Sequence, residues 1–122
     1  MDHHDLPPGL DAVSYYSGAI EAFCELIAGG LKPMALSAPL DEPLAAQVGV
    51  LARRSAAKYG LHFLEEKNFP RTDLTPADSV KGKTIFIFCR DKSVLDAYQS
   101  LKIRARAGEN VSGGLRRLLG YP

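Results

Sequence analysis

The sequence predicts one α/β domain, in which a small sheet of about three strands, mixed or parallel, is packed with helices. Apolar residues recur at spacings of three and four in 11–28, 41–60 and 91–107, which is typical of helices with one buried side. Short apolar runs between these segments, such as 85–89, are typical of strands. A chain of 122 residues is long enough to bury one core.

The composition, 46% hydrophobic and 24% charged, is that of an ordinary globular protein and gives no sign of a disordered or fibrous chain. Two prolines and a glycine stand together at 7–9. We therefore expect 1–10 to form a flexible arm and 11–122 to form the single domain.

The first helix is expected to begin after Asp11, because a carboxylate at this place accepts hydrogen bonds from free backbone N–H groups. Gly29 and Gly30 should end it. Its buried side follows a helical period: Val13, Tyr16, Ile20, Phe23 and Ile27. The run 31–40 is expected to be a strand, with prolines near its ends, where a missing N–H is tolerated.

The second helix is expected to be capped by Asp41 and closed by Gly60 in a left-handed turn. The run 61–66 then forms the second strand. A helix that joins two strands of one sheet normally makes a right-handed crossover between parallel strands, so 31–40 and 61–66 should form such a unit.

The connection 67–83 has no clear period and is long enough to be a functional or mobile loop. The run 84–90 is the clearest strand in the chain. Its successive apolar residues indicate burial on both faces, as in the middle of a sheet covered by helices.

The third long helix is expected over 91–107, capped by Asp91 or Ser93. A short last helix should begin with Ser112 as its cap and end at Gly120. The residues after Gly120 are expected to fold back as a hydrophobic closure.

Cys89 stands at the carboxyl end of the central strand and directly before a helix, where α/β sheets often bind ligands. The helix dipole, Arg90 and Lys92 would favour its thiolate. His62 on the second strand is a candidate base, if the two strands are neighbours and the side chains share a face. Catalytic Cys89 and His62 would define a thiol-dependent enzyme; the alternative for each is a packed structural residue.

The charges are unevenly distributed along the chain. Residues 1–80 carry 6 Lys and Arg against 11 Asp and Glu, whereas 81–122 carry 9 against 3. The basic half could be compensated within the fold or could present an anion site. Backbone N–H groups at a helix start would assist such a site. Its candidate ligand-binding residues are Arg90, Lys92, Ser93, Arg116 and Arg117.

Two carboxylate pairs are not expected to form a catalytic site. Glu65 and Glu66 are adjacent on a strand, so alternation directs them to opposite faces. Glu21 and Glu25 share one side of the first helix, but no further metal ligand is evident there, and a solvated acidic face is expected.

Several protein classes are disfavoured. Two separated cysteines give neither a disulfide framework nor a CxxC pair, and no nucleotide, zinc-protease or hydrolase motif occurs, so no metal or cofactor is expected. A net charge of +1 makes a nucleic-acid partner unlikely. No apolar run approaches the roughly 20 residues that span a bilayer. The acidic start lacks the features of a secretory signal, so a cytoplasmic location is expected.

The segment 114–122, with Leu119, Gly120, Tyr121 and Pro122, resembles an uncharacterised prokaryotic family, found mainly in archaea, whose members carry Leu-Gly-Tyr-Pro after a short helix. In that family cysteines typically follow, and this sequence ends at Pro122. The resemblance implies no activity, because the family has none established.

Together these features predict a small binding or interaction module, which recognises an anionic small molecule or an acidic partner surface. Whether it is also an enzyme stays open. Alternatives are the thiol-dependent enzyme and a non-catalytic oligomeric assembly protein. A small sheet leaves its edges exposed, which favours a homodimer.

Overall fold

The computed structural model describes residues 11–70 and 80–120. The expected arm 1–10, the middle of the expected loop 67–83, and the closure at Tyr121 and Pro122 lie outside them. The elements are, in chain order, α1 (Ala12–Ala28), β1 (Met34–Leu36), α2 (Leu44–Tyr59), β2 (His62–Glu66), β3 (Ile85–Cys89), α4 (Lys92–Arg106) and α5 (Ser112–Leu118).

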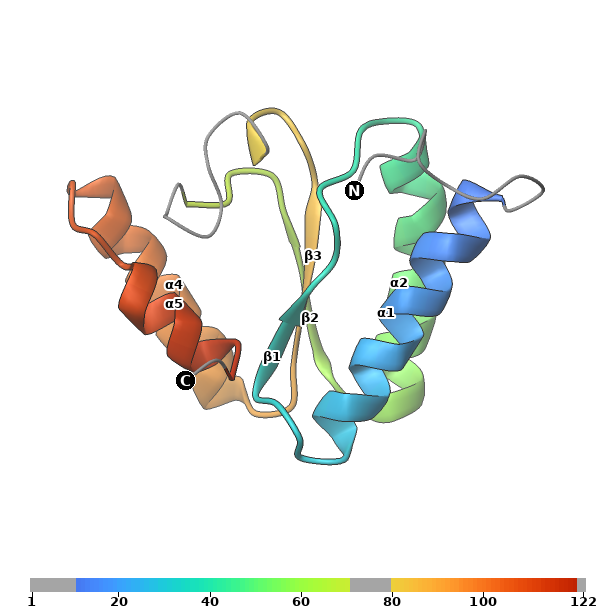
Figure 1. Cartoon of the computed structure of the whole chain (residues 1–122), viewed down its shortest axis with the longest axis horizontal. Coiled ribbons are helices and arrows are strands. Elements are labelled where there is room, and N and C mark those ends of the chain that lie inside the picture. The colour runs from blue at the N-terminus through green and yellow to red at the C-terminus, as the bar shows by residue number, and fades with distance from the viewer. Residues whose placement is uncertain (1–10, 71–79, 121–122) are drawn as a thin grey trace.

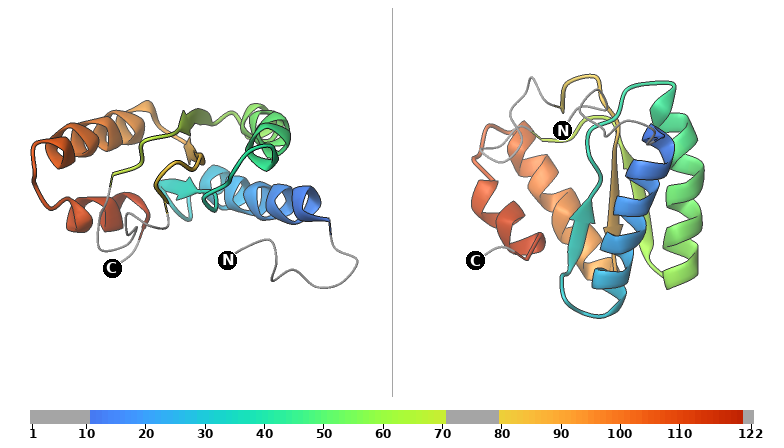
Figure 2. Two further views of the ribbon diagram at one scale, coloured as in Figure 1. Left: turned by 90° about the horizontal axis from the view of Figure 1, so that it is seen from above. Right: turned by 45° about the vertical axis from the view of Figure 1, so that its right-hand side comes forward.

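The elements form three layers (Figure 1). Helices α1 and α2 cover one face of the sheet, and α4 and α5 cover the other. The same layers are seen from above and at an angle in Figure 2. The α/β class and the three-stranded sheet are confirmed.

The strand order is β1-β3-β2, and β3 is antiparallel to both neighbours. Strands β1 and β2 therefore run in the same direction, as a crossover through α2 requires, but they do not pair. β3 takes the place between them because it is the strand with apolar residues on both faces. The paired strands are thus antiparallel throughout. β1 and β2 are the edges of this sheet, and the homodimer remains a prediction.

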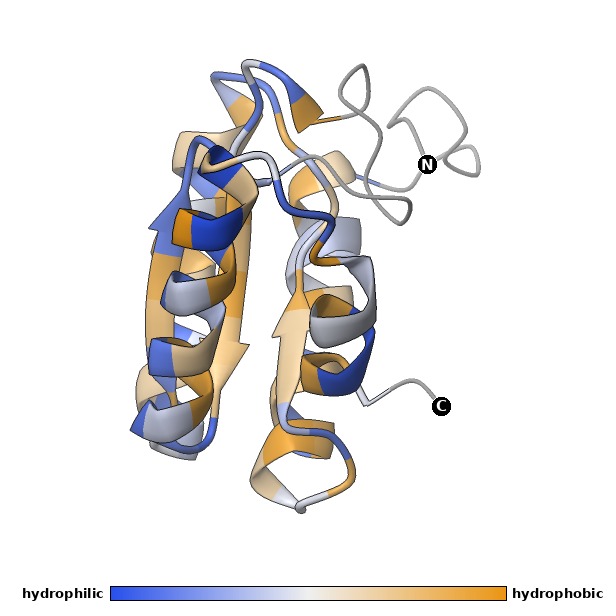
Figure 3. Ribbon diagram, turned by 90° about the vertical axis from the view of Figure 1, so that its left-hand side faces the viewer, coloured by the Kyte–Doolittle hydropathy of each residue, from blue (hydrophilic) through white to orange (hydrophobic). Residues whose placement is uncertain are grey.

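Every residue of β3 is buried, which confirms the expected burial on both faces. Phe86 and Phe88 point to α1 and α2, whereas Ile85, Ile87 and Cys89 point to α4 and α5. This alternation divides the core into two apolar clusters, one on each side of the sheet. Figure 3 shows the result: the strands carry mostly hydrophobic colours, and hydrophilic residues recur along the helices.

Several of the expected helix ends are confirmed, among them Gly29, the C-cap of α1. Asp11 caps α1, and its carboxylate accepts from the backbone N–H of Val13 and Ser14 at 3.3 and 3.4 Å. Gly60 closes α2 in the left-handed conformation, at φ 66°. The positions of Asp11 and Gly60 depend only on local chemistry, a short polar side chain or the absence of Cβ.

Other expected caps are wrong. Helix α2 begins after Pro43, and the carboxylate that accepts from its first turn is that of Glu42, 3.3 Å from the Ala46 N–H, so Asp41 is not its N-cap. The cap expected at Ser112 is displaced by two residues, because the side chain of Asn110 accepts from the Ser112 N–H at 3.0 Å. By contrast, Asp91 is the N-cap residue of α4, as one of the two alternatives predicted, although its side chain accepts no hydrogen bond from the helix.

Helix α5 lies close against α4. A Cβ on Gly114 would approach Cδ2 of Leu101 to 2.8 Å, so only a glycine lets the helices come this near without movement of Leu101. Among the described residues, no helix is long and apolar enough to cross a membrane.

Candidate functional site

A buried carboxylate lies at the end of β2, on the α4 side of the sheet. Glu66 is 4% exposed. Its oxygens accept hydrogen bonds from the Tyr98 hydroxyl at 2.8 Å, from Nζ of Lys102 at 2.7 and 2.8 Å, and from the Asn68 backbone N–H at 2.9 Å. We call Glu66, Tyr98 and Lys102 the Glu66 cluster. The neighbouring Glu65 is exposed on the opposite face, as alternation predicted.

The hydrogen bonds decide the charge state of the Glu66 cluster. Burial alone would raise the pKa of Glu66, but hydrogen bonds from Lys102, Asn68 and Tyr98 outweigh it, and the pKa is lowered from the ordinary 4.5. Burial raises the pKa of the Tyr98 phenol, and so does its hydrogen bond to Glu66. At neutral pH the carboxylate is therefore charged and the phenol is neutral.

A cavity of about 330 Å³ adjoins the Glu66 cluster. The segment after β2 forms one wall and the C-terminal end of α4, with the turn after it, forms the other. We call it the Lys102 pocket. Its lining includes Asn68, Pro70, Lys102, Ala105, Arg106 and Glu109.

Cys89 and His62 are brought together by the sheet. They are direct partners in the β2–β3 register, so the two strands are neighbours and the residues share a face. Cys89 is fully buried against α4 and α5, however, and burial raises the pKa of its thiol to about 12. The expected lowering of this pKa by the helix start, Arg90 and Lys92 is wrong, because desolvation dominates.

His62 is exposed, and no hydrogen bond joins it to Cys89. A thiol that is almost never ionised at neutral pH is a poor nucleophile. The geometry therefore favours the alternative that Cys89 is a packed structural residue.

The predicted ligand-binding residues gather at one end of the molecule. Arg90 and Lys92 flank the start of α4, and Arg116 and Arg117 lie in the last turn of α5. We call these four residues the basic end. All four are exposed, as is Ser93 in the first turn of α4. Figure 1 shows that the start of α4 and the end of α5 lie at the same end of the fold, near the turn between α1 and β1.

Two close approaches fix this arrangement. Nη1 of Arg90 lies 3.1 Å from the position that a Cβ on Gly30 would occupy. A Cβ on Gly120, just after α5, would lie 3.5 Å from Cβ of Lys32. Both segments thus contact the same short turn, although they are separated in the sequence by a whole helical hairpin.

The cations of the basic end differ in their partners. Lys92 forms an ion pair with Asp96 at 3.2 Å, one helical turn away. Arg90, Arg116 and Arg117 form no ion pair or hydrogen bond with any residue in 11–70 or 80–120. Three guanidinium groups are therefore available at this surface.

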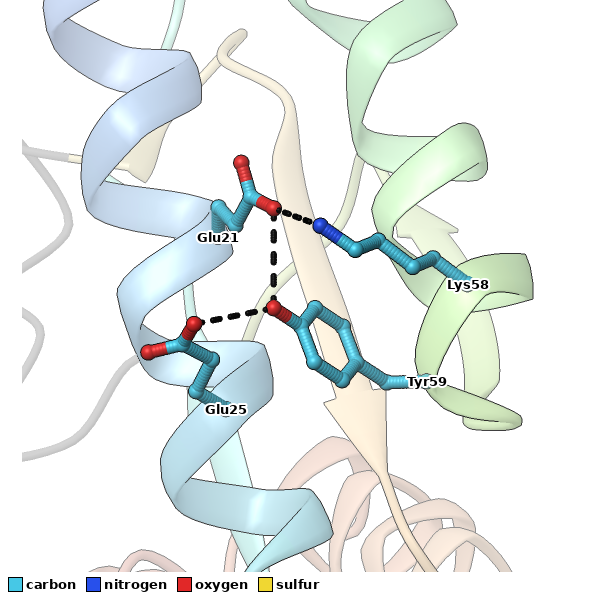
Figure 4. A network of polar contacts seen from close by, with 4 residues as sticks. All are labelled: Glu21, Glu25, Lys58 and Tyr59. Atoms are coloured by element: carbon cyan, nitrogen blue, oxygen red, sulfur yellow. Dashed lines mark hydrogen bonds and ion pairs between the residues drawn. The ribbon is translucent and has the colours of Figure 1, made fainter.

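A second network joins α1 and α2 on the opposite side of the sheet (Figure 4). Nζ of Lys58 donates to Glu21 at 2.6 Å, and the hydroxyl of Tyr59 donates to Glu25 at 3.0 Å. The hydrogen bond from Lys58 lowers the pKa of Glu21 and raises that of Lys58. The expected acidic face is thus partly neutralised by α2.

A groove of about 330 Å³ lies beside this network, between the two helices. Both sides contribute small residues, such as Gly18 and Ser55, and Glu21 and Lys58 border it. Glu21 and Lys58 are already paired with each other, which leaves Arg54 as the other charged residue of its lining and makes the groove a weaker candidate than the basic end.

Sequence reasoning missed the Glu66 cluster. Two signals could have indicated it. Alternation places Glu66 on the same face as Leu64, which packs into the α4 side of the core. Tyr98 and Lys102 stand four residues apart, on one side of α4. Neither signal identifies the partner, because the pairing depends on which helix covers that face.

No family model, no curated protein and no solved structure matches the chain. Within 11–70 and 80–120, no group of three or more His, Cys, Asp or Glu side chains could hold a metal ion. Fold and site together describe a three-layered α/β domain with a cationic surface at one end.

Proposed function

We propose that this protein is a binding module whose basic end docks onto an anionic partner. The observation that carries the proposal is the convergence at one end of the fold of three guanidinium groups, from Arg90, Arg116 and Arg117, that pair with no other described residue. Guanidinium groups bind carboxylates and phosphates with two parallel hydrogen bonds. The three groups come from two segments that meet only in the folded protein.

The start of α4 adds to this surface. Asp91 leaves the first N–H groups of the helix without a side-chain cap, and these groups carry the positive end of the helix dipole. Asp91 and Asp96 are the carboxylates of the same segment. With four cations against these two carboxylates, the surface stays positive.

The number of separate cations at the basic end favours an extended partner over a small molecule. Neither of the two cavities described above borders the basic end. Exposed single ion pairs contribute only about 0.2–1 kcal/mol, so useful affinity needs several contacts at once. An acidic protein surface, with many carboxylates, supplies them.

Binding of a labelled polyglutamate peptide tests the proposal. We expect binding that weakens steeply as salt is raised toward about 0.15 M, since screened contacts depend on ionic strength. Replacing Arg116 and Arg117 together with glutamine should weaken binding at least tenfold, for a loss of roughly 1.4 kcal/mol or more.

The chain offers a matched control in Arg53 and Arg54, a second adjacent pair of exposed arginines, on α2. Their double replacement with glutamine changes the net charge equally and should leave binding within about twofold of the parent protein. Equal losses of peptide affinity in the two double variants would show that binding depends only on net charge. That result would contradict the proposal that the basic end is the binding site. A stronger response to inorganic phosphate than to the peptide would point instead to a small anionic ligand.

A further inference from the structure

The Lys102 pocket lies away from the basic end, toward the C-terminal end of α4, and its walls are fixed by the core. Phe69 is buried and stacks on the ring of Tyr98, with ring centroids 5.8 Å apart. The Asn68 backbone N–H is held by Glu66 at 2.9 Å. These contacts anchor the segment 68–70 to β2 and α4, so the pocket exists before any ligand enters.

Hydrogen-bond donors line this cavity. Two contacts of Lys102 Nζ go to Glu66, and an ammonium group has three N–H donors, so at least one is available. Arg106 lies one helical turn further on the same side of α4, and its guanidinium forms no hydrogen bond or ion pair with a described residue. The side-chain amide of Asn68 is likewise without a partner among residues 11–70 and 80–120.

The charge balance of the pocket is small and positive. Glu66 offsets Lys102, and Glu109 forms an ion pair with Arg104 at 2.5 Å. Among the described residues, Arg106 remains as one uncompensated cation. The C-terminal end of α4 contributes about half a negative charge from the helix dipole, which leaves room for one negative charge on a ligand but not for two.

The remaining lining is compact and partly apolar. Pro70 and Ala105 provide non-polar surface beside the donors. The volume of about 330 Å³ stands at the lower end of the range for ligand pockets, roughly 300–1,000 Å³. A ligand that fits would have a short apolar body and one anionic group.

We propose that the Lys102 pocket binds a small molecule with a single carboxylate, held by Arg106 and by the free donors of Lys102 and Asn68. This site is separate from the basic end, and it does not depend on the proposed docking function. Glu66 has the role of holding the Lys102 ammonium at the floor of the pocket. It is a positioning residue, since its own oxygens are already occupied.

Sodium benzoate is a suitable probe, with benzamide as its uncharged isostere. Amide chemical shifts of the full chain, followed by two-dimensional NMR during titration, should move at Asn68, Phe69 and 102–109 with benzoate and stay in place with benzamide. They should not move at 90–93 or 115–118, which report on the basic end. Shifts confined to 90–93 and 115–118, or no saturable shift of any amide, would overturn the proposal.

Arg106→Gln should weaken benzoate binding at least tenfold, because a charge-assisted hydrogen bond is lost. The Arg106 side chain is exposed and forms no hydrogen bond or ion pair with the described residues, so the variant should fold. Arg116→Gln removes the same charge at the basic end and should leave the dissociation constant within about twofold. Equal affinities of the Arg106→Gln variant and the parent protein would refute the assignment.

Glu109→Gln provides a gain-of-affinity test. It frees Arg104 and adds one positive charge beside the pocket, so benzoate should bind more tightly, and unchanged or weaker binding would contradict the charge argument. Phenyl phosphate, which carries up to two negative charges, should bind no better than benzoate. Tighter binding of phenyl phosphate would reject a carboxylate as the ligand class.

Discussion

The ammonium group of Lys102 lies 2.7 Å from Oε2 of Glu66, inside the layer between the sheet and α4. Their side chains are 16% and 5% exposed, and the surrounding residues of this layer are mostly apolar. A charge removed from water is costly unless it is paired and hydrogen-bonded. The pair therefore makes α4 and β2 depend on each other.

Loss of Lys102 should be more damaging than loss of both partners. Lys102→Met keeps the apolar stem but leaves the Glu66 carboxylate buried with only Tyr98 and Asn68 as partners. We expect the free energy of unfolding to fall by about 3 kcal/mol in urea titrations at neutral pH. The double variant Glu66→Gln/Lys102→Met should recover part of this loss. A single variant that unfolds like the parent protein would mean that the ion pair is not buried in solution.

The Glu66 cluster should make stability depend on acid pH. The pKa of Glu66 is lowered in the folded protein below the ordinary 4.5, so the carboxylate contributes stability that is fully present above that value. The contribution is lost as the pH falls through the folded pKa. In denaturant titrations at neutral pH, the free energy of unfolding of the parent protein should exceed that of Glu66→Gln. This difference should shrink as the pH is lowered.

Glu65→Gln is the control for this pH profile, since it removes the same charge at an exposed position next to Glu66. Its difference from the parent protein should be small and should vary less with pH. Parallel profiles for Glu66→Gln and the parent protein would argue against an ionised buried carboxylate.

The two thiols should react slowly in the native protein. The pKa of Cys89 is about 12 instead of 9.0, which lowers its thiolate fraction about a thousandfold, and burial blocks access as well. Burial raises the pKa of Cys24 to about 11. Alkylation by iodoacetamide, followed by mass spectrometry, should be fast only after denaturation.

His62→Ala tests the thiol-enzyme hypothesis in the same assay. The variant should leave the labelling rate of Cys89 unchanged, because the exposed imidazole forms no hydrogen bond with the thiol. Rapid native labelling of Cys89 that is lost in His62→Ala would revive that hypothesis.

Two helical glycines should respond in opposite directions to alanine. A Cβ on Gly18 in α1 would meet nothing within 4 Å, so Gly18→Ala should stabilise the protein by up to about 1 kcal/mol through helix propensity. A Cβ on Gly49 in α2 would lie 3.1 Å from Cζ of Phe86. That ring is 1% exposed and stacks on Phe63, so it has little room to move.

We therefore expect Gly49→Ala to destabilise the protein by about 1 kcal/mol or more, since overpacking outweighs the gain in propensity. Thermal and urea unfolding of both variants would measure this. Equal stabilisation by the two alanines would show that α2 can move away from β3 without cost.

Much of the fold could be predicted from local patterns. The apolar run at 85–89 predicted a strand buried on both faces, and the spacing of apolar residues predicted α1, α2 and α4. Asp11 and Gly60 marked helix ends correctly because a cap is a contact between residues a few positions apart. Caps were predicted wrongly at Asp41 and Ser112, because several polar residues near each helix start can accept hydrogen bonds from its first N–H groups.

The site could be predicted only in part. Arg90 and Arg116 were recognisable as cations of a basic half, but the sequence does not say that the turn at Gly30 brings them to one end. For Cys89, the sequence suggested that the dipole of the following helix favours the thiolate. The structure shows that its side chain points sideways into the α4 and α5 core, where desolvation outweighs the nearby positive charges.

The helices and most of the strand positions follow from local sequence patterns, because helical and strand periods are set by residues that are near neighbours along the chain. The packing of the folded chain places β3 between β1 and β2, brings Glu66 to Lys102, and divides the arginines between two ends of α4. These outcomes depend on strand register and on which helix covers which face. Both are contacts between segments far apart in the sequence, and no local pattern encodes them.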